Sequence, residues 1–127
     1  MDIITHNKID FSLCGKPLLT EKDFSKVELK TSDQMSVDQT ELVHGGFIFG
    51  LADHAAMIAV NHPNVVLGAA EVKFLRPVKA GETVIAEAKV VEKKDKKNSV
   101  TVSVSRGEEI VFEGMFTCFV LKKHVLG

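Results

Sequence analysis

Residues 44–60 read HGGFIFGLADHAAMIAV, and this stretch decides the fold. The part from Phe47 to Asn61 favours a helix, because four of its residues are alanine, the residue with the highest helix propensity. Apolar side chains occupy nearly the whole circumference of this helix, and such a helix must be buried on every side. A chain of 127 residues can meet that demand only by wrapping a sheet around the helix or by adding a partner chain.

The segments around the helix alternate between apolar and polar side chains, which predicts strands that bury one face. Phe24 to Lys30 is the first expected strand, and residues 31–41 are polar and turn-like. About four more strands are expected after the helix, at residues 70–75, 82–91, 99–105 and 110–121. The connectors between them, residues 76–81 and the charged tip at 93–98, are short enough to predict an antiparallel meander.

These elements predict a single domain of the α+β class over residues 1–127, with an antiparallel sheet wrapped around one long central helix. Residues 23–123 form its expected core. Residues 1–22 show no clear periodicity and contain Gly15 and Pro17, so we expect them to be a loosely organised lead-in.

The composition excludes several classes of protein. With 45% hydrophobic residues, 26% charged residues and a net charge of -1, the chain resembles neither a disordered protein nor a nucleic-acid binder. Its two cysteines form no CxxC or Cys/His cluster, so no structural zinc site is expected. We expect no other metal and no cofactor. No signal-peptide pattern is present, and the longest apolar stretch is too short to span a bilayer. We therefore expect a reduced, cytoplasmic protein without membrane contacts.

Asp53 is the most informative residue, because it lies in the middle of the helix that must be buried. An unpaired buried carboxylate costs several kcal/mol. His54 points to a different face of the helix, and no Lys or Arg lies three or four residues away. A salt bridge from the sheet or from another chain is the structural alternative to a catalytic or ligand-facing role.

His44-Gly45-Gly46 stands immediately before this helix. Two glycines leave the first N–H groups of a helix unshielded, so that a ligand atom can approach the backbone closely. The positive end of the helix dipole also favours a developing oxyanion at this position. For His44 itself, packing or capping of the helix is an equally reasonable role.

The run from His44 to Ala55, together with FLRPVKAGE at residues 74–82, resembles hot-dog-fold acyl-CoA thioesterases of the phenylacetate-degradation (PaaI) type. The combination of HGG, LAD and FLRP followed by AGE is specific, and the resemblance covers roughly the whole domain, residues 24–121. It implies the hot-dog fold, in which a sheet wraps one long helix. It also implies hydrolysis of a small or medium acyl-CoA or aryl-CoA thioester.

The resemblance also implies roles for individual residues. Asp53 matches the catalytic carboxylate, either a nucleophile or a general base, and Gly45 matches the glycine whose N–H polarises the thioester carbonyl. His44 matches the histidine that supports this loop. At the position where the family often has an asparagine that places the lytic water, this chain has Asp38. An ionised aspartate only accepts hydrogen bonds, so this difference bears on hydrolysis.

The spacing between Gly45 and Asp53 predicts an oligomer. They are eight positions apart, or roughly 12 Å along a helix. A nucleophile and an oxyanion donor must each lie about 3 Å from the reacting atoms, so one helix cannot supply both groups to one carbonyl. Two antiparallel helices can, which predicts a homodimer with two shared sites, or a dimer of dimers.

Three further residues are candidate substrate contacts: Gly46 near the thioester, Phe74 in the acyl pocket, and Arg76 at the CoA phosphates. The lysines at residues 93–97 are better explained as a solvated hairpin that protects a sheet edge.

Two other functions are open. A non-catalytic acyl-CoA sensor or carrier is the main alternative, favoured by Asp38. A hot-dog dehydratase would need a histidine base such as His54 or His62, but the expected His/Asp arrangement is absent. His6 and His124 suggest no assignment from sequence.

Overall fold

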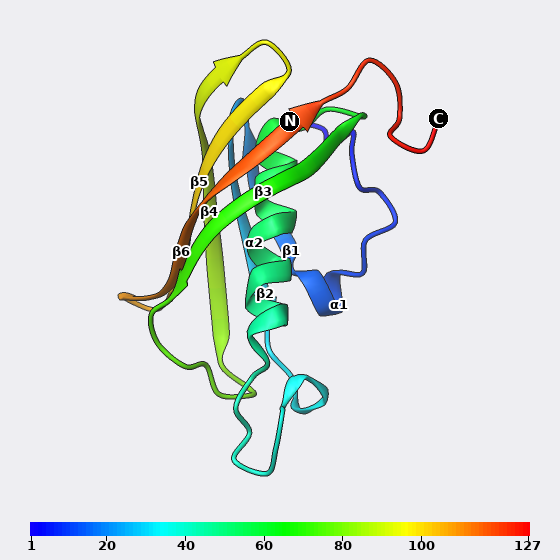
Figure 1. Ribbon diagram of the computed structural model, residues 1–127. Helices are drawn as coiled ribbons and strands as arrows, with labels where there is room; N and C mark the ends of the chain where they lie inside the picture. Colours follow the sequence, from blue (N-terminus) through cyan, green and yellow to red (C-terminus); the bar gives the residue numbers. More distant parts are fainter.

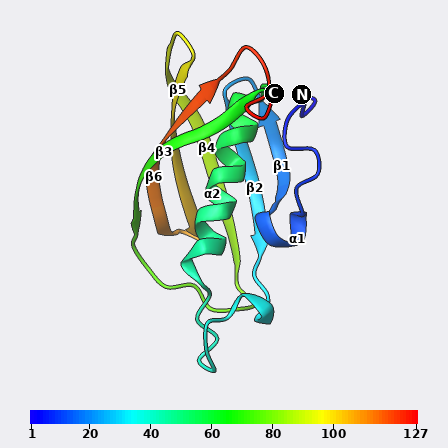
Figure 2. The same cartoon turned by 45° about the vertical axis from the view of Figure 1, so that its right-hand side comes forward.

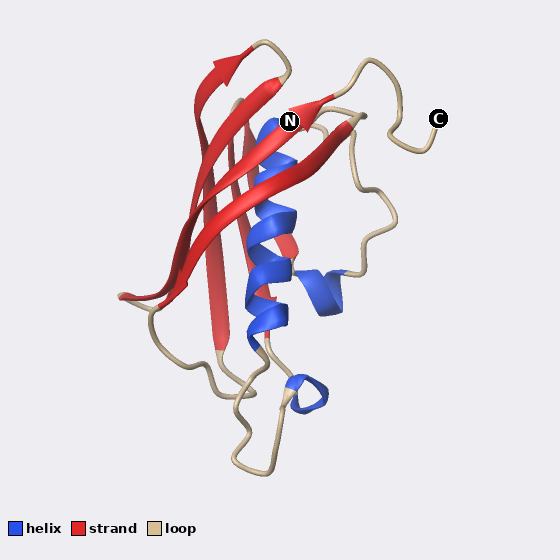
Figure 3. Cartoon of the chain, in the orientation of Figure 1, coloured by secondary structure: helices blue, strands red, loops and turns tan.

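The computed structural model describes residues 1–127 and has one six-stranded antiparallel sheet that curves around a central helix (Figure 1). The long helix is α2, Gly45–Val60. The strands follow the order β1-β2-β4-β5-β6-β3 across the sheet. Their bounds are β1 Lys16–Glu21, β2 Phe24–Lys30, β3 Val65–Phe74, β4 Thr83–Lys94, β5 Lys97–Arg106 and β6 Glu109–Val120. A short helix α1, Phe11–Cys14, and a 3₁₀ turn η1, Asp33–Met35, complete the fold (Figure 3).

Helix α2 is buried against the concave face of the sheet, chiefly on β2, β4 and β5. Its small side chains let the strands approach closely. Ser25 on β2 shows how close this approach is, because its buried Oγ donates a hydrogen bond of 2.7 Å to the carbonyl of Ala55. The helix ends at Asn61, which adopts a left-handed conformation with φ 51°. The predicted central helix is confirmed, and the α+β class with it.

The strand pairing differs from the predicted meander at one point. β4, β5 and β6 do form consecutive hairpins, but β3 pairs with β6, from Val65 opposite Val120 to Phe74 opposite Phe112, and not with β4. Residues 75–82 carry the chain from one edge of the sheet to β4. Period-2 alternation fixes which side chains face the core, but not which strands are neighbours, so the sequence pattern alone could not reveal this crossover.

The predicted lead-in was also wrong, because residues 11–21 contain both α1 and β1. Asp10 caps α1 by accepting a hydrogen bond of 2.8 Å from the Ser12 N–H. β1 is an edge strand with a register shift between Pro17 and Leu19. This bulge interrupts the alternation, and proline is normally found at sheet edges, so the usual strand pattern is hidden here.

No helix of the chain is long and apolar enough to cross a membrane.

Two glycines with the same backbone φ of +97° give a controlled test of how Gly15, between α1 and β1, packs against α2 and β2. A Cβ atom on Gly15 would lie 2.6 Å from Leu51 Cδ1 and 2.8 Å from Val27 Cγ1, whereas a Cβ on Gly81 would meet nothing within 4 Å. Both alanine variants suffer backbone strain, but only Gly15→Ala also overpacks the core. We expect Gly15→Ala to lower the free energy of unfolding by about 1–3 kcal/mol more than Gly81→Ala in urea titrations. Equal losses would contradict this account of the packing.

Candidate functional site

The amino end of α2 is capped by the side chain of His44. Its Nδ1 accepts a hydrogen bond of 2.6 Å from the Gly46 N–H, so the proton of the neutral imidazole is on Nε2. A Cβ on residue 46 would lie 2.8 Å from the His44 ring, so only glycine allows this cap. The Gly45 N–H has no hydrogen-bond partner within the chain. The capping role considered for His44 is thus observed, and it leaves one helix N–H free to bind a ligand.

Gly45 and Phe74 border an apolar cavity of about 240 Å³. The Phe74 ring lies so close to Gly45 that a Cβ there would be 3.0 Å from Phe74 Cε1. Phe74 in turn packs edge-on against Phe112, with ring centroids 5.1 Å apart. The cavity is lined by Leu42, Val43, Gly45, Ile48, Phe74, Leu75, Arg76, Pro77, Val78 and Val111. The structure therefore brings three of the candidate residues, Gly45, Phe74 and Arg76, to one cavity.

Asp53 lies two turns further along α2 and is half-buried. Its Oδ1 atom is buried and has no hydrogen-bond partner, and no Lys or Arg forms a salt bridge with it. Burial raises the pKa of this carboxyl above its ordinary value of 3.8, and the charge of His6 partly opposes that rise. The salt bridge considered as a structural alternative is thus absent within the chain.

Asp38 lies apart from Asp53 within one chain. It is exposed in the segment between η1 and α2, and its Oδ1 accepts hydrogen bonds from the Thr40 N–H at 2.9 Å and from the Thr40 hydroxyl. These two bonds lower the pKa of the Asp38 carboxyl. The cavity at Gly45 includes neither Asp38 nor Asp53. One chain therefore does not assemble the whole set of predicted catalytic residues.

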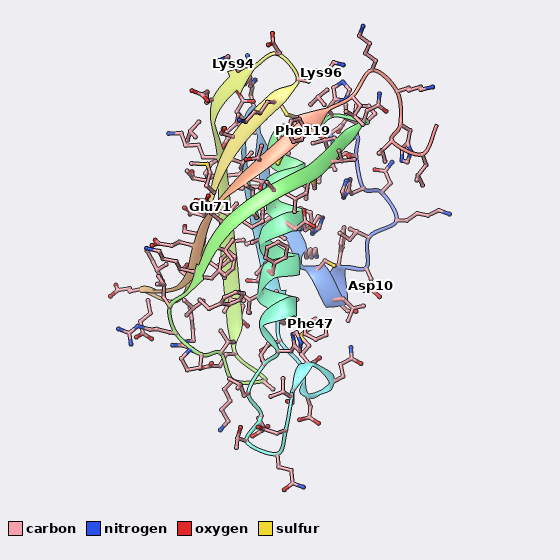
Figure 4. The ribbon with its side chains drawn as sticks, viewed as in Figure 1. Asp10, Phe47, Glu71, Lys94, Lys96 and Phe119 are labelled. Carbon is pink, nitrogen blue, oxygen red and sulfur yellow. The ribbon has the colours of Figure 1, made fainter.

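The cationic candidates are solvated. Arg76 forms an exposed salt bridge of 3.3 Å with Glu109. The lysine tip between β4 and β5 lies at the opposite end of the molecule from the start of α2, as the positions of Lys94, Lys96 and Phe47 show in Figure 4. This placement agrees with a solvated hairpin.

His54 and the cysteines have structural environments. His54 is buried, stacks on Phe11, and holds its Nδ1 3.1 Å from the carbonyl of Cys14. Burial lowers its pKa, which favours the neutral form of the ring. Burial and the nearby Asp53 charge raise the pKa of the Cys118 thiol to about 12. No group of three or more His, Cys, Asp and Glu side chains has the geometry to hold a metal ion.

The sequence pattern of the thioesterase superfamily matches residues 41–113, which include the capped helix, Asp53 and the FLRP connector. The chain belongs to the thioesterase superfamily. Its α+β fold is the hot-dog fold, as the resemblance implied.

Sequence relatives of this thioesterase-superfamily chain are mostly longer proteins. A methylthioribose-1-phosphate isomerase of Aquifex aeolicus is 52% identical over 122 residues, which are 95% of the chain but 27% of that protein. Transcription factor FapR of Bacillus subtilis is 34% identical over 103 residues, 80% of the chain and 54% of FapR. The chain thus spans between about a quarter and about half of these two relatives.

Among solved structures, an uncharacterized protein from Pyrococcus horikoshii has a TM-score of 0.99 and 54% identity, and the match covers 100% of this chain and 98% of that one. The phenylacetic acid degradation protein PaaI of Thermus thermophilus, solved as a mutant, is more distant, with a TM-score of 0.78, 27% identity, and coverage of 86% and 95%. A Streptococcus mutans protein bound to acetyl CoA shares the fold at a TM-score of 0.77 and 24% identity, with coverage of 87% and 90%.

The raised pKa of Asp53 predicts a stability that depends on pH. The folded chain binds this proton more tightly than the unfolded chain does, so the carboxyl reduces stability as the pH rises from its unfolded value through the higher folded pKa. Asp53→Asn removes the charge and should therefore be more stable than the parent at neutral pH, by on the order of 1 kcal/mol. The advantage should shrink as the pH falls toward about 4, because the folded parent then increasingly binds a proton at this carboxyl. Urea titrations at both pH values test this, and an asparagine variant less stable at neutral pH would contradict it.

Proposed function

We propose that this protein hydrolyses acyl-CoA thioesters, with Asp53 as the reactive carboxylate and the Gly45 N–H as the donor to the carbonyl oxygen. The observation that carries the proposal is the buried, unpartnered Oδ1 of Asp53 on a helix that is otherwise apolar. A buried acceptor without a partner is costly, and such groups are concentrated at functional sites. The free N–H at Gly45, next to an apolar cavity, supplies the complementary half of the site.

The two halves come from two chains in this proposal. Gly45 and Asp53 are separated by roughly 12 Å of helix, which is too far for both to contact one carbonyl. β3 supports pairing of two copies, because this ten-residue strand is at the edge of the sheet, and one side of its backbone lacks a neighbouring strand. A homodimer with a two-fold axis would place Gly45 of each chain near Asp53 of the other.

The chemistry follows from this arrangement. The carbonyl oxygen of the thioester accepts a hydrogen bond from the Gly45 N–H, where the dipole of α2 favours the negative charge that develops. Asp53 of the facing chain either attacks the carbonyl carbon and forms an anhydride, or removes a proton from an attacking water. In both routes the C–S bond breaks, the thiolate of CoA takes up a proton, and one water is consumed to give the carboxylic acid.

The cavity beside Gly45 gives the acyl group a place to bind. Its volume of about 240 Å³ and its aliphatic and aromatic lining suit a small or medium acyl or aryl group, as in the PaaI type. Gly46 keeps the backbone accessible, Phe74 forms one side of the cavity, and Arg76 at its rim is the candidate contact for a CoA phosphate. Asp38 of the facing chain is the candidate for placing the water.

A non-catalytic acyl-CoA-binding module is the second candidate. Two observations favour it: Asp38 stands where the family often has asparagine, and the chain is similar to part of a transcription factor. Turnover separates the two candidates, because a sensor binds acyl-CoA without releasing thiol.

Asp53→Asn keeps the size of the side chain but removes the carboxylate, so hydrolysis of a panel of acyl-CoA substrates should fall by about 100- to 10,000-fold. Release of free thiol measures the rate, and calorimetry should still detect binding of acyl-CoA. Glu113→Gln is the matched control, because Glu113 is exposed on the outer surface of the sheet on the interior strand β6. Activity retained by the asparagine variant would refute the catalytic role of Asp53.

Mixing two inactive variants tests whether the sites are shared. Gly45→Val blocks the donor half, and Asp53→Asn removes the carboxylate. In a mixed dimer one site carries both changes and the other carries neither. Co-refolding equal amounts should restore about a quarter of the parent activity, since half of the dimers are mixed and each has one intact site. No recovery from well-folded mixtures would show that each chain supplies its own site.

A further inference from the structure

The connector of residues 75–82 forms one side of the cavity beside Gly45. It runs from the end of β3 to the start of β4, across the end of the sheet at which α2 begins (Figure 2). Of the 10 residues that line the cavity, Arg76 in this connector is the only one with a charged side chain. Arg76 is therefore the one cation that the chain places at the wall of the cavity.

Arg76 is attached to β6 through both its backbone and its side chain. Its N–H donates a hydrogen bond of 3.2 Å to the Val111 carbonyl, which also accepts one of 2.8 Å from the Leu75 N–H. The guanidinium approaches Glu109 by its Nε edge, with Nε 3.3 Å from Oε2. Neither terminal nitrogen of Arg76 makes a hydrogen bond within the chain. These two nitrogens are therefore free to bind the oxygens of a phosphate as a fork.

Glu109 is held in turn by Arg106, its partner across the turn between β5 and β6. The Nη2 of Arg106 donates a hydrogen bond of 2.7 Å to Glu109 Oε1, so the two oxygens of this carboxylate face two different guanidinium groups. The hydrogen bond from Arg106 and the charges of Arg76 and Arg106 lower the pKa of the Glu109 carboxyl, which favours its ionised form. Exposed ion pairs contribute little by themselves, but this carboxylate is fixed by a second bond before it meets Arg76.

Arg106 is less exposed than Arg76, and its donors are used within the chain. Its side chain is 24% exposed, compared with 59% for Arg76. Its Nη1 donates a hydrogen bond of 2.7 Å to the Pro77 carbonyl and one of 3.1 Å to Glu82 Oε1. Glu82 Oε1 also accepts a hydrogen bond of 2.7 Å from the Lys79 N–H. Arg106 therefore ties the connector to the β5–β6 hairpin, and Arg76 is the guanidinium that can contact a ligand.

We propose that Glu109 is a positioning residue which, anchored by Arg106, holds the guanidinium of Arg76 at the rim of the cavity so that its two terminal nitrogens bind a phosphate of CoA. The proposal rests on the proposed function, in which Arg76 contacts a CoA phosphate. A mobile arginine side chain loses conformational entropy when it binds a ligand, and a guanidinium that is already oriented loses less of it. Glu109 thus strengthens the binding of an anion although it is itself an anion.

The carboxylate of Glu109 acts on a bound phosphate in two opposite ways. Its negative charge repels the phosphate, so a carboxylate that only lies near the site would weaken the binding of CoA, and its neutralisation would tighten it. A carboxylate that orients Arg76 has the opposite effect, and its neutralisation weakens the binding of CoA. The sign of the change in the Kd of CoA therefore distinguishes positioning from simple repulsion.

Glu109→Gln removes this charge and keeps the size of the side chain. The Kd of CoA, measured by calorimetry, should rise by about 3- to 10-fold, because Arg76 must then be ordered on binding. The KM for an acyl-CoA should rise by a similar factor, with kcat within about twofold of the parent. Binding of pantetheine, which lacks the phosphates and the nucleoside, should not change. Glu108→Gln is the matched control, because Glu108 is exposed in the same turn and forms no salt bridge, and it should leave the Kd of CoA unchanged.

Arg76→Gln supplies a second background for the same measurement. Both side chains are at least half exposed, so these variants should fold. Arg76→Gln should raise the Kd of CoA by about tenfold or more, and Glu109→Gln should no longer weaken binding in this background, because Glu109 acts through Arg76.

The role of Glu109 would be overturned if Glu109→Gln bound CoA as tightly as the parent or more tightly, or if it weakened binding equally with and without Arg76. A parent protein that releases no thiol, but whose binding of CoA weakens in Glu109→Gln, would instead refute the proposed hydrolysis and support the positioning role.

Discussion

Burial of a helix that is apolar on nearly all sides is the constraint on which this structure depends. α2 carries too few polar side chains to face water, and one sheet must bend around it to cover it. The alanines of the helix permit this, because a small side chain lets a strand pass close to the helix axis. The curvature of the sheet, its strand order and the long edge strand β3 all serve to enclose one helix. Asp53 is therefore conspicuous: it is the one acidic side chain of the helix.

The same constraint explains why much of the fold could be predicted. The composition of residues 47–61 requires burial, and alternation in the later segments requires a half-buried sheet, so the α+β class follows from both. What alternation cannot report is which strands pair, and β3 was accordingly placed beside the wrong neighbour. β1 escaped prediction because a bulge and Pro17 at the sheet edge break the alternation. Predictions from periodicity hold best where strands are regular and central.

The candidate site, like the fold, could be predicted only in part from the sequence. Asp53, Gly45 and His44 were identified because each residue is unusual in its local context, and the structure gives His44 a capping bond and Asp53 an unpartnered oxygen. The contact between Phe11 and His54 could not be found in this way. Phe11 lies in a segment without periodicity, 43 positions before His54, and only the folded chain stacks the two rings. A buried carboxylate oxygen without a hydrogen-bond partner lowers the stability of the fold, and such groups are concentrated at functional sites.

The hydrogen bond from Ser25 to the Ala55 carbonyl has a consequence for the orientation of the helix about its own axis. Alanine side chains are small and interdigitate little with their neighbours. They therefore do little to prevent translation of a helix along its axis or rotation about it. The hydrogen bond from Ser25 on β2 to the Ala55 carbonyl favours one rotation of α2 about its axis. A shift of one residue would rotate every side chain by about 100°. Such a rotation would point the Asp53 carboxylate in a different direction relative to the sheet. The Ser25 hydroxyl on β2 thus helps to set the direction in which the Asp53 side chain leaves the helix.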